Sequence, residues 1–291
     1  MRRVRDSVFV VPAVVEVARR RGFLAAEGVE LVTTMTASSA AQRQDLDSGA
    51  VDLAVTSTDN LFAWNAAGSD IAVVAQIETT TDLALVLRPG LRSLDDLDVV
   101  RLAVDAPTNG FAIVAYAMMS RLGRTSAQYE VAEVGGVRER FDALADGSVD
   151  ASLLAPPLDE IGRGRGMSVA MRVATLTPAY PGLGVVASRS LLDSDVDALS
   201  AYLRALDEAI RWMREAPPAD VEQELQDAGL GPAAVASAVA TVPASLLPSA
   251  EGLEVLARLR HELGMTVPGA PGAADLVDLR ALRAAGLHPA R

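Results

Sequence analysis

The chain has 291 residues, a formal net charge of −12, no cysteine and only two histidines, His261 and His288. Without cysteine there is no disulfide and no thiolate ligand, and two histidines near the C-terminus offer little material for a metal site or a Ser-His-Asp triad. The negative charge disfavours nucleic acid, and no apolar run reaches the ~18 residues that a membrane span needs. We therefore expect no metal, no cofactor, no nucleic-acid partner and no membrane span.

The first segment, RRVRDSVFVVPAVVEVARRRGF, has the look of a secretory leader but is better explained as a strand followed by a helix. A leader needs an unbroken apolar stretch, whereas Pro12 and Glu16 interrupt this one and three arginines follow it. The segment also fills the first place of a module that occurs again later. We therefore expect a cytoplasmic protein, with export as the alternative if a leader has been removed upstream of Met1.

In chain order, the first module is expected to contain a strand at 2–6, a helix at 12–21 that Pro12 can begin, and a strand at 28–32. It then continues through AQRQDLDSGAVDLAV at 41–55, which indicates the end of an amphipathic helix, a glycine turn and a short strand. The second module repeats this order with a strand at 101–105, a helix at 111–122, a strand at 129–134 and ERFDALADGSVDASL at 139–153.

The two copies correspond at a constant offset. The matching pairs are Leu46 with Leu144, Gly49 with Gly147, Val51 with Val149, and Asp52 with Asp150. Two strand–helix–strand–helix–strand units predict two parallel sheets that are covered by helices and have right-handed crossovers.

Apolar extended runs flank the second module at 81–90 and 181–189 and are expected to be antiparallel strands. There the chain would pass from one domain to the other and return. From residue 191 the apolar spacing becomes helical, which predicts helices at 191–216, 218–229, 231–241 and 249–264. A last short helix is expected after VPGAPGAAD.

The layout, with ARRRGFLAAEGVELV, SGAVDLAVTSTDN and a tail that ends in DLVDLRALRAAG, resembles the type 2 periplasmic binding protein fold over nearly the whole chain. More narrowly, it resembles the NMT1/THI5-like branch, which contains sulfonate-, taurine- and thiamine-precursor-binding proteins and yeast-type pyrimidine synthases. The resemblance implies an α/β protein with two lobes, each a mostly parallel sheet covered by helices, and a helical C-terminal tail. The lobes would be 1–85 with 186–291 and 86–185, joined by hinge strands at about 83–89 and 182–188.

Two enzyme activities of this branch depend on residues that this chain lacks. The sulfinate desulfinase is similar over the first module, but its nucleophilic cysteine would fall on Phe9, which cannot attack sulfur. Pyrimidine synthases use an active-site histidine, and neither module contains one. The resemblance therefore implies neither of these activities.

Ligands of parallel sheets bind beyond the carboxyl ends of the strands, where the helices begin. The loops expected there are rich in Ser, Thr, Asp, Asn and Gly, and their N–H groups and helix dipoles favour an anion. Arg138 adds a positive charge at a helix start, and three aromatic side chains could stack on a ring. The expected ligand-binding residues are Ser7, Phe9, Ser38, Ser39, Thr58, Asp59, Asn60, Asp105, Thr108, Asn109, Phe111, Gly135, Gly136, Arg138, Pro156 and Tyr180.

Structural roles explain many of these residue types equally well. The serines, threonines and Asn109 could do no more than cap their helices, and Asp59 could be a cap as well. Asp6 and Asp105, each at the expected end of a first strand, could form turns. Arg138 could pair with Glu133, and the aromatic rings could belong to the core.

Three functions are compatible with these observations. The family's usual role favours a binding protein for a small organic ligand, anionic or aromatic, in the cleft between two lobes, which would serve an ABC transporter permease if exported. The second is a cytoplasmic lyase, a decarboxylase or dehydratase, without cofactor, cysteine or histidine. Its general base would be Asp59, Asp6 or Asp105. The third is a cytoplasmic ligand sensor.

Overall fold

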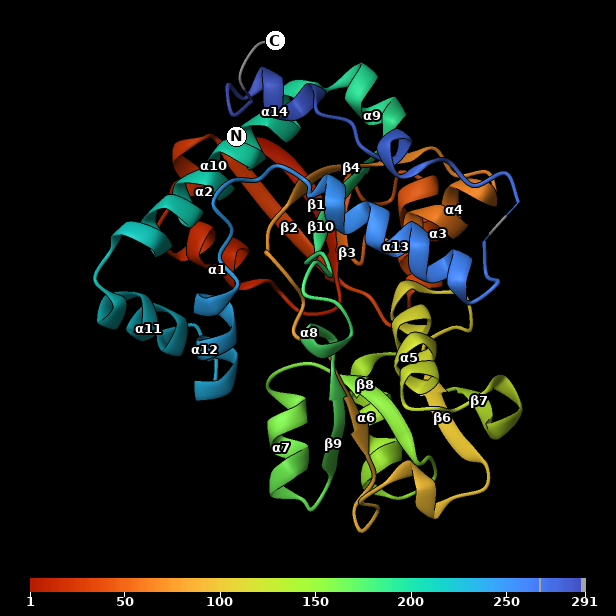
Figure 1. Cartoon of the computed structure of the whole chain (residues 1–291). Helices are drawn as coiled ribbons and strands as arrows, with labels where there is room; N and C mark the ends of the chain where they lie inside the picture. The colour runs from red at the N-terminus through yellow and green to blue at the C-terminus, as the bar shows by residue number, and fades with distance from the viewer. Residues whose placement is uncertain (267, 289–291) are drawn as a thin grey trace. The chain divides into compact units, whose positions relative to one another are not determined.

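The computed structural model describes residues 1–266 and 268–288. They form two compact α/β units, each with its own five-stranded sheet (Figure 1). The first unit contains Met1–Thr80, Pro181–Leu253 and the described residues from 268 onward, and the second contains Thr81–Tyr180 and Glu254–Thr266. The chain thus has the two α/β bodies that the sequence predicts.

The sheet of the first unit has the order β2 (Val29–Met35), β1 (Arg2–Val8), β3 (Leu53–Thr56), β10 (Gly184–Ser188) and β4 (Ile71–Gln76). Strand β1 is parallel to β2 and β3, whereas β10 is antiparallel to both β3 and β4. Four strands therefore run in one direction, and only β10, the strand by which the chain returns from the second unit, opposes them. Both the mostly parallel sheet and the antiparallel returning strand are confirmed.

Strand β1 is longer than the sequence predicts. It was expected to end at Asp6, but Ser7 and Val8 still pair with Thr34 and Met35 of β2. By their composition, Asp6 and Ser7 suggest a turn. The strand continues nevertheless, because β2 still pairs with β1 at Ser7 and Val8. The extension decides where the Asp6 side chain lies.

The first unit contains helices before, between and after these strands. They are α1 (Ala13–Arg20), α2 (Phe23–Ala26), α3 (Ser39–Asp47), α4 (Asn60–Ala66), α9 (Arg189–Ser194), α10 (Val196–Glu215), α11 (Pro218–Asp227), α12 (Pro232–Ala240) and α14 (Arg280–Ala284), with a 3-10 turn η3 at Ala273–Leu276. A further helix, α13 (Ala250–Glu262), begins in the first unit and ends in the second. The single helix expected over 191–216 is two, because Asp195 leaves the helical conformation and caps α10 by accepting from the Ala198 N–H at 3.2 Å.

The main core of the first unit lies between the sheet and the long helix α10. Val4 and Val8 of β1 are buried there together with Tyr202, Leu206 and other apolar residues of α10. Helix α10 also packs against α1, α2 and α14, and α10 and α14 lie side by side in Figure 1. This face of the sheet is therefore closed by apolar packing.

The sheet of the second unit repeats the same order with its own strands: β7 (Tyr129–Glu133), β6 (Val100–Val104), β8 (Ala151–Leu154), β5 (Ala84–Leu87) and β9 (Ser168–Arg172). Its helical elements are α5 (Gly110–Arg121), α6 (Val137–Ala145), α7 (Leu158–Gly164) and α8 (Val173–Leu176), with 3-10 turns η1 (Leu94–Asp96) and η2 (Ser126–Gln128). Strand β5 is antiparallel to β8 and β9, as β10 is to its neighbours in the first unit.

The hydrogen bonds reproduce the duplication that the sequence predicts. The Asp52 carboxylate accepts from the Arg5 N–H at 2.8 Å, and the Asp150 carboxylate accepts from the Arg101 N–H at 2.8 Å. The glycines before these strands, Gly49 and Gly147, have φ values of 70° and 77°, a conformation that favours glycine over residues with a Cβ. The repeated Gly-x-Val-Asp motif is therefore a structural device that joins helix to strand in both copies.

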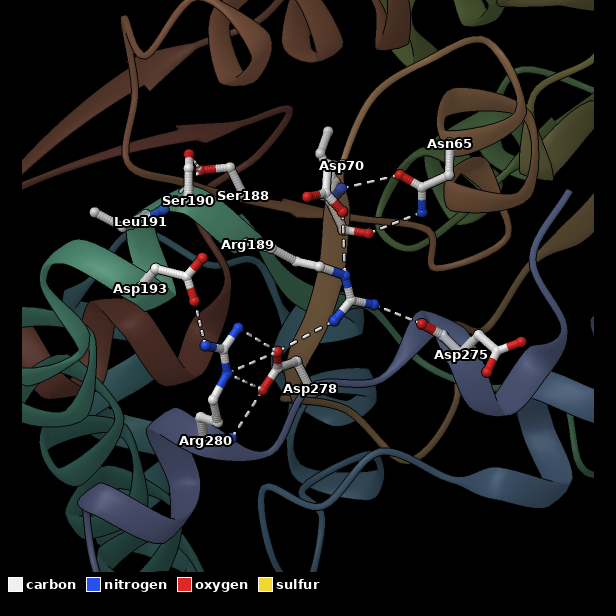
Figure 2. A network of polar contacts seen from close by, with 11 residues as sticks. Asn65, Asp70, Ser188, Arg189, Ser190, Leu191, Asp193, Asp275, Asp278 and Arg280 are labelled. Carbon is white, nitrogen blue, oxygen red and sulfur yellow. Dashed lines mark hydrogen bonds and ion pairs between the residues drawn. The ribbon is translucent and has the colours of Figure 1, made fainter.

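The C-terminal tail is held on the first unit by a polar network (Figure 2). The Asp278 carboxylate accepts from Arg189 Nη1 at 3.1 Å and from Arg280 Nη2 at 2.8 Å. Arg189 also donates to the Asp275 carbonyl, and Arg280 also donates to Asp193. The network joins β10 and α9 to the segment that leads into α14.

Candidate functional site

Gln42 connects two strand ends in the first unit. It is the fourth residue of α3, on the same face as the buried Leu46, and its side chain is fully buried. Its Nε2 donates to the Ser7 carbonyl at 2.9 Å and to the Val55 carbonyl at 3.2 Å. These bonds fix the amide orientation, so that Oε1 becomes the free acceptor, and it has no partner among the described residues.

Two hydroxyl groups at the same strand ends also lack a partner. Ser7 is fully buried and Thr58 is 3% exposed, and neither hydroxyl oxygen has a hydrogen-bond partner in residues 1–266 or 268–288. Ser7 lies near the end of β1, and Thr58 follows β3 and lies against Gly184 of β10. A buried polar group without a partner costs about 1–3 kcal/mol, and such groups are rare in native proteins unless a water or ligand reaches them. We call Ser7, Gln42 and Thr58 the strand-end cluster.

The other polar residues expected in the first unit lie close to Gln42 or Thr58 in the sequence. Ser38 caps α3 by accepting from the Ala41 N–H at 3.1 Å, so its structural role is confirmed. Asn60 donates to the Thr56 hydroxyl at 3.0 Å. Ser39 and Asp59 are buried, at 4% and 0% exposure. These contacts leave Ser7 and Thr58 as the expected residues whose hydroxyls the described protein does not satisfy.

Apolar side chains lie exposed at the same edge of the sheet. Phe9, which follows β1, is half-buried, its neighbour Val10 is 65% exposed, and Met35 at the end of β2 is 58% exposed. Ligand sites combine an apolar lining with a few placed polar groups. Phe9 thus remains a candidate for contact with an apolar ligand part.

Asp6 requires a correction. Because β1 continues to Val8, Asp6 lies within the strand, and alternation places its side chain on the face of Val4 and Val8, toward the core under α10. The side chain is fully buried, and burial raises its pKa, while the Thr33 hydroxyl and the charge of Arg19 act in the opposite direction. This placement removes the reason for treating Asp6 as a candidate base at a strand end.

In the second unit, the loop after β6 is organised by Asn109. Its side chain caps α5 by accepting from the Ala112 N–H at 2.8 Å and donates to the Asp105 carboxylate at 2.8 Å. Thr108 is exposed, and its carbonyl accepts from Arg260 Nη2 at 3.0 Å. Phe111 is half-buried. Asp105 and Asn109 are therefore brought together, and their first role is to shape this loop.

The loop after β7 contains the glycines and the arginine that the sequence singled out. Gly135 has a φ of 105°, and Gly136 is the N-cap of α6, where no side chain caps the helix. Arg138 is exposed and makes no hydrogen bond or ion pair within the described residues, so the pairing with Glu133 is not formed. The buried arginine of this helix is instead Arg140, at 4% exposure.

The two remaining expected residues lie elsewhere in the second unit. Pro156 follows β8 and is joined to Pro157 by a cis peptide bond just before α7. Tyr180 is only 1% exposed, so its ring is part of the packed interior of the described chain. Pro156 thus lies at a strand end like the other candidates, and Tyr180 has the environment expected of a core residue.

Gln42 and Arg140 were missed from the sequence, although they occupy equivalent positions of the duplicated module. Each is the fourth residue of its helix, four residues before a buried leucine, Leu46 or Leu144. A polar residue on the buried face of an amphipathic helix is the signal that could have found them.

Comparisons with known proteins agree with this architecture. A family model described as NMT1/THI5 like matches residues 12–219. No curated protein matches the chain. Within the described residues, no helix is both long enough and apolar enough to cross a membrane.

Several solved structures share the fold at low sequence identity. The ligand-binding component of an ABC-type import system from Staphylococcus aureus, solved with zinc bound, has a TM-score of 0.81 and 15% identity, with 98% of this chain and 99% of that chain covered. The alkanesulfonate-binding protein SsuA from Xanthomonas axonopodis pv. citri, bound to MOPS, has a TM-score of 0.75 and 18% identity, with 95% and 98% covered. The desulfurization enzyme DSZB has a TM-score of 0.67 and 14% identity, with 98% and 99% covered. Binding proteins and an enzyme thus share this fold.

Proposed function

Because the chain belongs to the NMT1/THI5-like family, we propose that it binds a small organic ligand, anionic or aromatic, at the carboxyl ends of its parallel strands. The fold is that of type 2 periplasmic binding proteins, and its neighbours include a ligand-binding component of an ABC-type import system and an alkanesulfonate-binding protein. Enclosure of the ligand by two lobes stays a prediction of the family resemblance.

The observation that carries this proposal is the strand-end cluster. Three buried polar atoms, Ser7 Oγ, Gln42 Oε1 and Thr58 Oγ1, have no partner within the described residues. Together they offer two hydroxyl donors and several acceptors at the edge where parallel sheets bind their ligands. A ligand with hydrogen-bonding groups would satisfy atoms that are otherwise costly to bury.

The exposed apolar side chains support an organic ligand over an inorganic ion. Val10 and Met35 lie beside the ends of β1 and β2 at 65% and 58% exposure, and Phe9 adds an aromatic ring. Small-molecule sites combine such an apolar lining with a few placed polar groups. The proposed ligand therefore has an apolar or aromatic body and a polar end.

The proposal extends to a partner. A binding protein of this fold would deliver its ligand to the permease of an ABC importer, as the Staphylococcus aureus neighbour belongs to an ABC-type import system. Delivery of this kind requires export, whereas the cytoplasmic location expected from the first segment would favour the lyase or the sensor. Fractionation of the native cells, with detection of the protein in the cytoplasmic and exported fractions, distinguishes these predictions.

Native mass spectrometry of the protein purified from its own cells tests the proposal. We expect an adduct of a small organic compound, which chromatography after denaturation recovers unchanged. Recovery of a chemically altered compound after incubation would support the lyase. The absence of any adduct, together with no thermal stabilisation by a panel of organic acids and aromatic compounds, would overturn the proposal.

A further inference from the structure

Arg140 takes the position in the second unit that Gln42 takes in the first. Both are the fourth residue of the helix that follows the second strand of the module, and both are buried. In the first unit this position contacts the strand ends of the candidate site. The duplication therefore directs attention to what Arg140 does at the strand ends of the second unit.

The contacts of Arg140 leave most of its guanidinium unused. Nη1 donates to the Gly135 carbonyl at 2.8 Å, and this is its only side-chain hydrogen bond within the described residues. A guanidinium has five N–H donors, and the side chain is 4% exposed, so water from the open surface reaches little of it. Nε and Nη2 are thus available to a further acceptor.

No carboxylate of the described protein forms an ion pair with this charge. Asp105 and Glu139 are near enough to favour the charged form, but the side-chain hydrogen bond of Arg140 goes to a backbone carbonyl and not to a carboxylate. Burial lowers the pKa of Arg140 to about 10, and the two carboxylates oppose that change. The side chain therefore stays positive at neutral pH, and its Nε and Nη2 can donate to an anion that reaches them.

The start of α6 adds donors at the same place. Gly136 is the N-cap and offers no side chain, so the first N–H groups of this nine-residue helix have no side-chain acceptor. A planar acid group can accept from Nε and Nη2 together, which is the arrangement that guanidinium groups favour with carboxylates. The buried arginine and the uncapped helix start are both suited to one anionic group.

We propose that Arg140 binds the acid group of an organic ligand, a carboxylate or a sulfonate, at the start of α6. The inference rests on the proposed function and deepens it, because it names organic acids as the ligand class and one residue that selects them. Arg121, the exposed last residue of α5, has the same charge and serves as the matched control.

Calorimetric titration with benzoate, methanesulfonate and the neutral benzamide tests the inference. We expect at least one of the two acids to bind the wild type and the Arg121→Gln variant equally and the Arg140→Gln variant at least about tenfold more weakly. Benzamide should bind wild type and Arg140→Gln alike or bind neither. Equal binding of the acids to wild type and Arg140→Gln, or no binding of either acid to the wild type, would overturn the inference.

A measurement on the unaltered protein covers the case in which Arg140→Gln does not fold. In ¹H–¹⁵N NMR spectra, benzoate or methanesulfonate should shift the backbone signals of Gly136 and Val137 and the Arg140 Nε–H signal, whereas equal concentrations of chloride should not. Unmoved signals would refute the role of Arg140. If a neutral compound from the native cells binds wild type and Arg140→Gln equally, the inference fails and the proposed function stands; if no organic compound binds at all, both fail.

Discussion

Replacing Ser7 by alanine is expected to stabilise the ligand-free protein while it weakens ligand binding. The Ser7 hydroxyl is fully buried and has no partner within the described residues. The unpaired hydroxyl costs about 1–3 kcal/mol, and alanine removes only this oxygen, so we expect a gain of about 1 kcal/mol after its packing contacts are lost. For a domain of about 150–250 residues this raises Tm by about 2–4 °C.

The duplicated module provides a matched control. Ser152 in β8 is just as buried as Ser7, but its hydroxyl donates to the Ala103 carbonyl at 3.0 Å. Ser152→Ala therefore loses a hydrogen bond that is made and should destabilise the protein by about 1 kcal/mol. Both serines belong to the equivalent strand pairs, since Ser7 pairs with Ala54 and Ser152 pairs with Ala103.

Scanning calorimetry of both variants without ligand, followed by titration of the compound recovered from native cells, completes the test. The stability changes should have opposite signs, and Ser7→Ala should weaken binding by about 10- to 100-fold because one ligand group loses its partner. If Ser7→Ala lowers Tm as much as Ser152→Ala does, the Ser7 hydroxyl has a partner within the protein and the reasoning is refuted.

Three further variants test the structure around the site. Gly184→Ala would place a Cβ 2.5 Å from Thr58 Cγ2 and should lower the free energy of urea unfolding by about 1–3 kcal/mol. Thr58→Ser removes that methyl group, so the double variant should regain the lost stability. Simple additivity of the two changes would contradict the contact. Burial acts to raise the pKa of Asp278, but hydrogen bonds from Arg280 and the charges of Arg280 and Arg189 outweigh burial and hold this pKa below its usual value. Asp278→Asn should therefore be about 2 kcal/mol less stable at pH 7, and the difference should fade as pH falls below about 4; a pH-independent difference would speak against the network. Burial raises the pKa of Asp6, so the folded state favours its protonated form. The contribution of Asp6 to the stability of the wild type therefore declines as pH rises above about 4. Asp6→Asn should thus have a higher Tm than wild type at pH 7 and the same Tm near pH 3, and a lower Tm at pH 7 would show that the ionised carboxylate is stabilised.

The duplication made most of the fold predictable from the sequence. Gly49 and Gly147 with Asp52 and Asp150 mark the same helix-to-strand connection in both copies, because a left-handed glycine and a carboxylate that binds a strand N–H are local requirements. The crossing strands β5 and β10 were also predictable, since each is a short apolar run between turn residues. These features depend on neighbours in the sequence or on a repeated pattern.

The side-chain environments at the site depended on tertiary contacts instead. By residue type, Asp6 is expected in a turn, and only the pairing of Ser7 and Val8 with β2 shows that it lies inside a strand. Arg138 and Arg140 have the same charge and lie two residues apart, and only the packing of α6 decides that the second is buried. Gln42 looks like a surface residue in AQRQDLD, yet it lies against β1 and β3. Residue type predicted which loops follow the strand ends but could not tell which polar atoms lack a partner.

A crystal structure of the protein with the compound that it carries from its own cells would show whether the strand-end cluster binds the ligand. We expect polar ligand atoms within about 2.7–3.2 Å of Ser7 Oγ or Thr58 Oγ1, at the ends of β1 and β3. A structure in which ordered water satisfies both hydroxyls while the compound lies elsewhere would contradict it.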